Sequence, residues 1–233
     1  MAFINKTLII FALLTFTLPN FIQAQEDEYK MEAGGMFGGS FYMGDANTST
    51  PFKNMQFAAG AMARFILNPH MAIKANLVIA KIAGNTADLK NKFPGNNQVS
   101  FNRNIFDLGA QYEYNFLGYG MGQEYKAIKR FTPYILGGMG FTFAPAPAKG
   151  VFTVNFPIGL GVKYKIGKRL NIGCETTMRL SLSDNLDVTN KEGLILSDPY
   201  GIKSTGMKNK DSYSFTTLFI TYDIFPKCKK CNN

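Results

Sequence analysis

The strongest constraint on this chain is an alternation of apolar and polar residues that continues over unusually long stretches. Between Met31 and Met43 every odd position is apolar or glycine, whereas the even positions hold Glu32 and mostly small or polar residues. This period of two predicts a β-strand with two different faces, longer than most strands of soluble sheets. A tilted strand of about 9–11 residues crosses a bilayer, and only a closed barrel leaves no backbone group unpaired in lipid.

The same alternation recurs along the chain and predicts eight strands. They are expected over residues 29–44, 56–67, 71–83, 101–116, 131–143, 152–165, 170–182 and 212–225. Tight turns such as Asn68-Pro69-His70 alternate with longer connections, of which 183–211 is the longest. Short periplasmic turns and longer external loops are typical of bacterial outer-membrane barrels. The sequence therefore predicts an all-β fold, an eight-stranded antiparallel up-and-down transmembrane barrel over residues 25–225.

Residues 1–24 have the features of an export signal. Lys6 supplies a positive start, residues 8–18 an apolar core, and Ile22-Gln23-Ala24 a cleavage site. The apolar core is too short to span a bilayer as a helix, so an uncleaved anchor is the weaker alternative. We expect the mature chain to begin at Gln25, to reside in the cell outer membrane, and to end in a periplasmic tail over residues 226–233.

The charge balance is basic, with 25 Lys and Arg against 16 Asp and Glu and a formal net charge of +9. Such an excess can indicate binding to nucleic acid. Here the charges are scattered over the predicted loops, and an exported chain rarely meets nucleic acid. We therefore expect outer-membrane lipid, and no nucleic acid, around this protein.

Aromatic residues gather near both ends of the predicted strands. The turn-side set is Tyr29, Phe65, Tyr114, Phe116, Phe131, Tyr164 and Phe225, and the loop-side set is Phe41, Phe57, Phe101, Phe141, Phe143 and Tyr213. Two such girdles mark the interfaces of a membrane barrel. A soluble barrel of the lipocalin type would also alternate, but it has no need of girdles or of a glycine-rich polar face. Lipid outside the barrel is therefore favoured.

Charged residues fall on the face that would line the lumen. We expect Glu32, Arg64, Lys74, Glu113, Lys163 and Asp223 near the turns, and Asp107, Glu175 and Arg179 further toward the loops. An unpaired charge in a narrow interior lowers the stability of the fold by roughly several kcal/mol. These residues should therefore form ion pairs that fill the lumen as a salt-bridge plug. A gated channel or proton path is the rival hypothesis, and it is weaker because small barrels fill with side chains.

The sequence offers little for catalysis or for a metal. The single histidine, His70, lies in a predicted turn, far from the loop side where an active site would lie. The acidic residues of the last loop do not fit the twelve-residue calcium loop. Cys228 and Cys231 lack the setting of a redox site and the further ligands of a zinc site, so a local disulfide or free thiols are expected. We predict no catalytic residue, metal, cofactor or small-molecule substrate.

Basic residues cluster at the predicted periplasmic rim. They are Lys126, Lys129, Arg130, Lys168 and Arg169. One interpretation is contact with phospholipid headgroups of the inner leaflet. The other is a collar for docking a periplasmic partner, where complementary charge sets orientation and association rate. The sequence leaves both open.

Three segments resemble the PorG-like family of small outer-membrane barrels from Bacteroidota, within the OmpA-like eight-stranded superfamily. They are Tyr42-Met43-Gly44-Asp45-Ala46-Asn47, Phe131-Thr132-Pro133-Tyr134 and Gly159-Leu160-Gly161-Val162-Lys163-Tyr164-Lys165. The resemblance implies a non-enzymatic barrel that accompanies type IX secretion as an accessory or anchoring component and touches periplasmic ring subunits of that machine. The alternative is a self-contained structural or adhesion barrel that acts through its extracellular loops.

Overall fold

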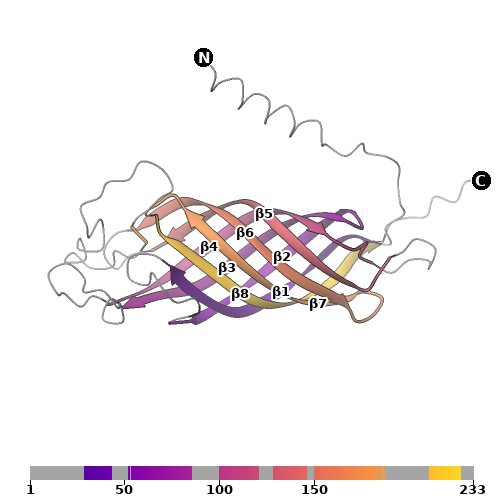
Figure 1. Cartoon of the computed structure of the whole chain (residues 1–233), viewed down its shortest axis with the longest axis horizontal. Coiled ribbons are helices and arrows are strands. Elements are labelled where there is room, and N and C mark those ends of the chain that lie inside the picture. Colours follow the sequence, from indigo (N-terminus) through magenta and orange to yellow (C-terminus); the bar gives the residue numbers. More distant parts are fainter. Residues whose placement is uncertain are drawn as a thin grey trace, which may run out of the picture.

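Eight antiparallel strands, connected in sequence order, close into one barrel (Figure 1). The computed structural model describes residues 29–43, 52, 54–85, 100–120, 128–145, 150–183, 185–186 and 210–226. The strands are β1 (Tyr29–Met43), β2 (Gln56–Asn68), β3 (Met71–Asn85), β4 (Ser100–Asn115), β5 (Phe131–Ala144), β6 (Val151–Lys165), β7 (Leu170–Ser181) and β8 (Ser212–Pro226). The predicted all-β class and the eight-stranded antiparallel up-and-down barrel are confirmed, and each strand limit falls within two residues of its predicted position.

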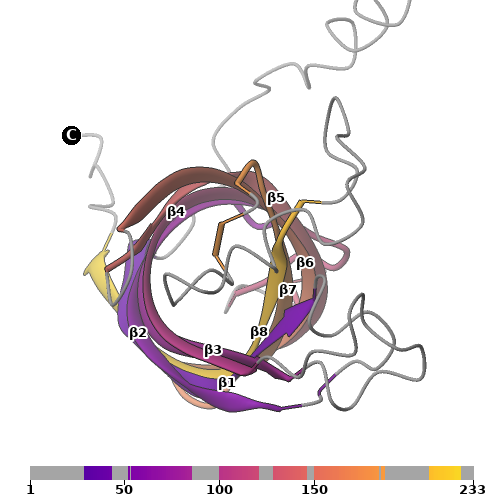
Figure 2. The ribbon, with the colours of Figure 1, turned by 90° about the vertical axis from the view of Figure 1, so that its left-hand side faces the viewer.

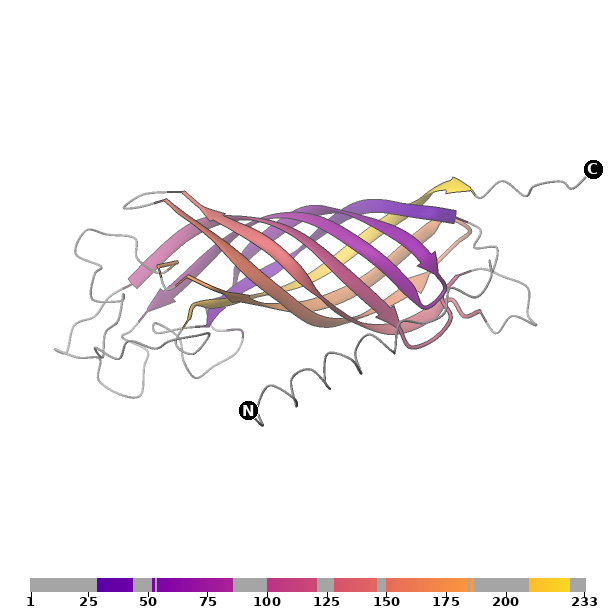
Figure 3. The same cartoon turned by 90° about the horizontal axis from the view of Figure 1, so that it is seen from above.

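The barrel closes where β8 pairs with β1, with Tyr29 opposite Pro226 and Met43 opposite Ser212. Seen along its axis, the strands form a continuous ring (Figure 2). The start of β1 and the end of β8 lie at the same end as the β2–β3 and β6–β7 turns (Figure 3). We call this the turn end and the opposite one the loop end.

Both tight turns have a clear local cause. The Asn68 side chain accepts a hydrogen bond of 2.8 Å from the backbone N–H of His70, and Pro69 between them has a fixed φ. At the second turn the N–H of Ile166 donates to the carbonyl of Leu170 at 2.9 Å.

Among the described residues, no helix has the length and apolar character needed to cross a membrane.

Alternation along each strand separates the lumen from the outer surface. In β4 every odd side chain from Phe101 to Asn115 is buried and every even one is exposed. In β8 Asp223 is buried as expected, and so is Phe219, whereas Leu218 and Ile220 are exposed. The outer face is largely aliphatic and aromatic, and Leu160 at 65% and Leu108 at 55% are among its most exposed side chains.

Three of the loop-side girdle residues were predicted wrongly. Phe101 and Tyr213 stand on the inward parity of their strands and are buried in the lumen. Phe41 points outward, but the ring of Phe52 covers it at a centroid distance of 4.9 Å. The other loop-side residues, Phe57, Phe141 and Phe143, are exposed, and so are two further aromatic residues, Phe106 and Phe152.

The predicted export signal (1–24) and all of the predicted tail except Pro226 lie outside the described residues. Cleavage at Gln25 and the limits of the mature barrel therefore stay predictions.

Candidate functional site

The turn half of the lumen is organised around one carboxylate, Glu113 of β4. Its Oε2 lies 2.8 Å from Arg64 Nε and 3.3 Å from Lys163 Nζ, and its Oε1 lies 3.7 Å from Lys74 Nζ. All four side chains are buried. They come from β2, β3, β4 and β6, so Glu113 connects strands on different sides of the barrel.

Two further carboxylates extend this cluster. Glu32 of β1 forms an ion pair with Arg64. Both oxygens of Glu175, on β7, accept hydrogen bonds of 2.6 Å from Lys74 Nζ. The sequence predicts that Glu175 lies closer to the loops than Lys74. The two side chains nevertheless meet, because the lysine stem spans the lumen from β3 to β7.

Asn171 of β7 joins a further ion pair to the cluster. Its Nδ2 donates to Glu32 Oε2 at 2.8 Å and to Asp223 Oδ1 at 2.7 Å, and its Oδ1 accepts from Lys165 Nζ at 3.0 Å. Lys165 and Asp223 also form an ion pair. These residues make up the lumen network: Glu32, Arg64, Lys74, Glu113, Lys163, Lys165, Asn171, Glu175 and Asp223.

Aromatic rings pack against the cations of the lumen network. The Arg64 guanidinium carbon lies 5.0 Å from the Phe219 ring centre, and Lys163 Nζ lies 5.0 Å from that of Tyr134. The Tyr134 hydroxyl also donates to Glu175 Oε2 at 2.7 Å. Contacts between a cation and a ring face are favourable when water is excluded.

These two rings fit only because glycines face them. A Cβ added at Gly161 would lie 2.6 Å from the Tyr134 ring, and one added at Gly173 would lie 2.3 Å from the Phe219 ring. Such distances are far inside van der Waals contact. The inward glycines of β6 and β7 therefore make the space that the two aromatic rings occupy.

A separate ion pair lies closer to the loop end. Arg179 Nε donates to Asp107 Oδ1 at 2.9 Å, and the Arg179 guanidinium packs against Phe215 at 4.3 Å. Asp107 Oδ2 accepts from the Tyr213 hydroxyl at 2.6 Å and from Asn155 Nδ2 at 2.8 Å. The carboxylate is thus surrounded by donors, as a buried charge requires.

Apolar side chains close the lumen at the loop end. Tyr42, Ile82, Phe101, Ile105 and Leu186 belong to one buried cluster there, and the rings of Tyr42 and Phe101 meet edge to face at 4.9 Å.

Two polar contacts hold the described ends of the β7–β8 connection beside this cluster. The backbone N–H of Leu186 donates to Asp211 Oδ2 at 2.8 Å, and Arg103 Nη1 donates to the carbonyl of Asn185 at 3.0 Å. The described ends of the last loop are therefore fixed against the barrel.

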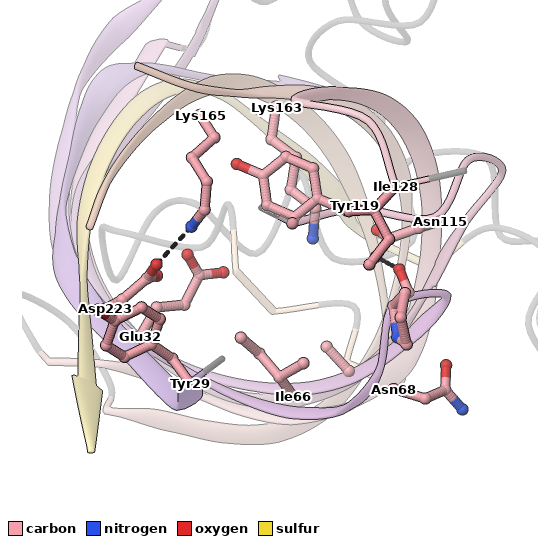
Figure 4. A pocket seen from close by; sticks show the side chains of 13 residues that line it. Tyr29, Glu32, Ile66, Asn68, Asn115, Tyr119, Ile128, Lys163, Lys165 and Asp223 are labelled. Carbon is pink, nitrogen blue, oxygen red and sulfur yellow. Dashed lines mark hydrogen bonds and ion pairs between the residues drawn. The ribbon is translucent and has the colours of Figure 1, made fainter. Parts of the chain in front are cut away.

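At the turn end, Tyr119 from the β4–β5 connection enters the mouth of the barrel (Figure 4). Its hydroxyl donates to Asn171 Oδ1 at 2.8 Å, and Lys163 Nζ lies 4.9 Å from its ring centre. Burial, together with the nearby Glu32 carboxylate, raises the pKa of Tyr119, so the hydroxyl keeps its proton. Beside it is a cavity of about 40 Å³, lined in part by Tyr29, Ile66 and Pro69.

The structure brings the predicted lumen residues together. All nine are buried, and each forms at least one ion pair with another charged side chain of the lumen. With Lys165 added, these ion pairs join five basic and five acidic side chains, so their formal charges cancel.

The other predicted sites have a simpler outcome. Lys129, Arg130, Lys168 and Arg169 are exposed at the turn end, whereas Lys126, Cys228 and Cys231 lie outside the described residues. His70 packs beside Tyr114, with its Nδ1 3.0 Å from the carbonyl of Asn115. In the part of the chain that the structure describes, His, Cys, Asp and Glu side chains form no group able to hold a metal.

Sequence reasoning missed two kinds of lumen residue. Lys165 has the same parity as Lys163 on β6, and that signal could have placed it in the network. Tyr119 lies in a connection without alternation, so no pattern in the sequence pointed to it. Asn171 has the inward parity of β7, but its role as a bridge depends on side chains from β1, β6 and β8.

Comparison with solved structures finds several small barrels. The N-terminal β-barrel domain of Pseudomonas aeruginosa OprF is similar with a TM-score of 0.46 and 11% identity, over 84% of this chain and 98% of that one. Neisserial surface protein A (NspA) is similar with a TM-score of 0.49 and 11% identity, over 85% of this chain and 98% of that one. Ail, the attachment invasion locus protein of Yersinia pestis, is similar with a TM-score of 0.45 and 9% identity, over 86% of this chain and 100% of that one.

A search of curated proteins gives no match. One family model, described as "Domain of unknown function (DUF6089)", matches residues 6–233, which is nearly the whole sequence. The chain belongs to the DUF6089 family.

Proposed function

We propose that this protein is a non-enzymatic outer-membrane β-barrel with a sealed interior, which acts through the surfaces at its two ends. One observation carries the proposal: the charges are paired inside the barrel while the apolar side chains face outward. Exposed apolar patches larger than a few hundred Å² are rare on soluble monomers, whereas a lipid-facing surface requires them. In the middle of a bilayer this arrangement exposes no charge to hydrocarbon.

A sealed barrel should not conduct ions. After reconstitution into a planar bilayer, the mature protein is expected to give no stable open channel, because the lumen network and the loop-end cluster fill the interior. The positive control is Glu113→Ala combined with Lys163→Ala, which removes one charge of each sign and should raise conductance. A large, steady single-channel current from the unmodified protein would show that the lumen is an open pore.

The turn end is the surface proposed to bind a periplasmic partner. Lys129, Arg130, Lys168 and Arg169 are exposed there, and none of them forms an ion pair with a carboxylate of the described residues. A basic rim of this kind suits an acidic partner surface. Together with the sequence resemblance to the PorG-like family, it supports an accessory or anchoring role beside a periplasmic ring assembly of the type IX secretion kind.

Charge reversal at the rim tests this role. In cells of the source organism, Lys129→Glu with Arg130→Glu should abolish crosslinking and co-purification of periplasmic subunits while the barrel still folds. Lys81→Glu, at an exposed position near the loop end, is the matched control and should leave the complex intact. If the complex survives charge reversal at the rim, and deletion of residues 185–208 abolishes adhesion of the cells, the adhesion alternative is correct.

A further inference from the structure

The outer surface of β6, β7 and β8 carries an apolar groove of about 400 Å³. Its sides are formed by Phe37, Tyr164, Ile172, Leu218 and Ile220, with Gly173 and Cys174 between them. The groove exists because β7 turns the small side chain of Cys174 outward, where the paired positions on β6 and β8 hold the larger Val162 and Leu218. Its volume is within the roughly 300–1,000 Å³ that is usual for small-molecule sites.

An arginine is held at the turn end of the same strands. Arg169 Nε donates to the Tyr29 hydroxyl at 3.0 Å, and its Nη1 lies 3.5 Å from the Tyr222 hydroxyl. Its guanidinium carbon lies 5.3 Å from the Tyr29 ring centre and 6.0 Å from that of Tyr222. The two tyrosines therefore fix an exposed cation in place.

Arg169 still has donors to offer. Its Nη2 makes no hydrogen bond and its charge has no carboxylate partner among the described residues. A planar guanidinium with free N–H groups is well suited to a phosphate.

The groove and the arginine are aligned along one surface. On β7 and β8, Tyr222 pairs with Leu170 and Ile220 pairs with Ile172. Tyr222, which contacts Arg169, is therefore next to the pair of isoleucines at the turn side of the groove. Cys174 follows Arg169 by five positions. At roughly 3.3 Å per residue the two lie about 17 Å apart along β7, or about 12 Å in depth when the strand is tilted by about 45°. One leaflet of hydrocarbon is about 15 Å thick.

We propose that this surface binds one phospholipid of the inner leaflet, with an acyl chain in the groove and the phosphate on Arg169. The inference rests on the proposed membrane location and deepens it. Two observations support it. The lining of the groove is almost wholly apolar, as an acyl chain requires. The Arg169 cation, which has no ion pair among the described residues, stands at headgroup depth.

The test is native mass spectrometry of the detergent-solubilised protein titrated with phosphatidylglycerol. We expect one lipid to bind more tightly than any later ones, and diacylglycerol with the same chains to bind more weakly. Arg169→Gln should weaken the first binding step about tenfold, because it removes a charge-assisted hydrogen bond to phosphate. Cys174→Phe should weaken it similarly by filling the groove.

Two matched controls separate the site from general effects. Arg130→Gln removes another exposed arginine at the same end, and Ala110→Phe enlarges a small outward side chain on β4. Both should bind phosphatidylglycerol as the unmodified protein does, and a heat-dependent gel shift confirms that each variant is folded.

The outcomes are distinct. If all variants bind lipid alike, or if Cys174→Phe instead abolishes a dimer seen in the spectra, the groove is not a phospholipid site. If the folded protein needs no detergent at all, the membrane proposal itself fails.

Discussion

Replacing Glu113 by alanine is expected to lower the free energy of unfolding by about 3–5 kcal/mol, the cost of leaving buried charge without its partner. Glu113 is close to three cations, Arg64, Lys74 and Lys163, and its side chain is completely buried. Arg64 and Lys74 each keep a second carboxylate. Lys163 forms no other ion pair among the described residues, so its charge carries most of the penalty.

Urea titration of the folded barrel in detergent micelles measures this effect, with the transition midpoint and slope followed separately. Glu113→Ala combined with Lys163→Met restores the charge balance and should recover a substantial part of the loss. Glu113→Gln keeps the shape and should still be destabilising, because the amide carries no charge. A loss below about 1 kcal/mol for Glu113→Ala would mean that water reaches the lumen and screens the cations, as at exposed ion pairs.

Most of the barrel follows from local sequence, because strand alternation is a short-range signal. Parity placed Asp107, Glu113 and Lys163 inside and Leu108 and Leu160 outside, and the structure agrees. The wrong predictions concern girdle residues that were chosen because they lie near a strand end, without regard to which face of the strand they occupy. Phe101 and Tyr213 were assigned to a girdle although their parity pointed inward, and the lumen is where they lie.

The partners inside the lumen could not be predicted in the same way. Lys74 meets Glu175 across the barrel although they are 101 positions apart in the chain. Which side chains meet there depends on the stagger between strands, which is a property of the closed barrel and not of any one strand. The position of Tyr119 depends on a connection that has no periodic pattern at all.

The balance of charge links the inside of the barrel to its ends. Because the ion pairs of the lumen join equal numbers of basic and acidic side chains, the interior adds nothing to the net charge of +9. The excess positive charge therefore belongs to residues outside these ion pairs. Electrostatic attraction to a partner or to lipid headgroups must come from those residues, which include the exposed basic rim at the turn end.

Leu160→Arg is expected to cost about 2–4 kcal/mol when the barrel is unfolded from phospholipid vesicles, the penalty for a cation near the middle of a bilayer. Leu160 is 65% exposed on the outer face of β6, between the aromatic residues Phe152 and Tyr164. If that surface faced water, an exposed leucine could be replaced by arginine with a change within about 0.5 kcal/mol. Leu108→Arg, on β4, should behave like Leu160→Arg because its side chain also points outward, at 55% exposure.

Depth supplies the matched control. Tyr164→Arg makes a comparable change on the same strand, four positions from Leu160 and next to the turn end. At that depth the arginine reaches the headgroups, so its cost should fall to about 0–1 kcal/mol. A steep difference between the two positions in vesicles requires hydrocarbon around the centre of the barrel. Equal costs at Leu160 and Tyr164 would place both in the same solvent and contradict the membrane assignment.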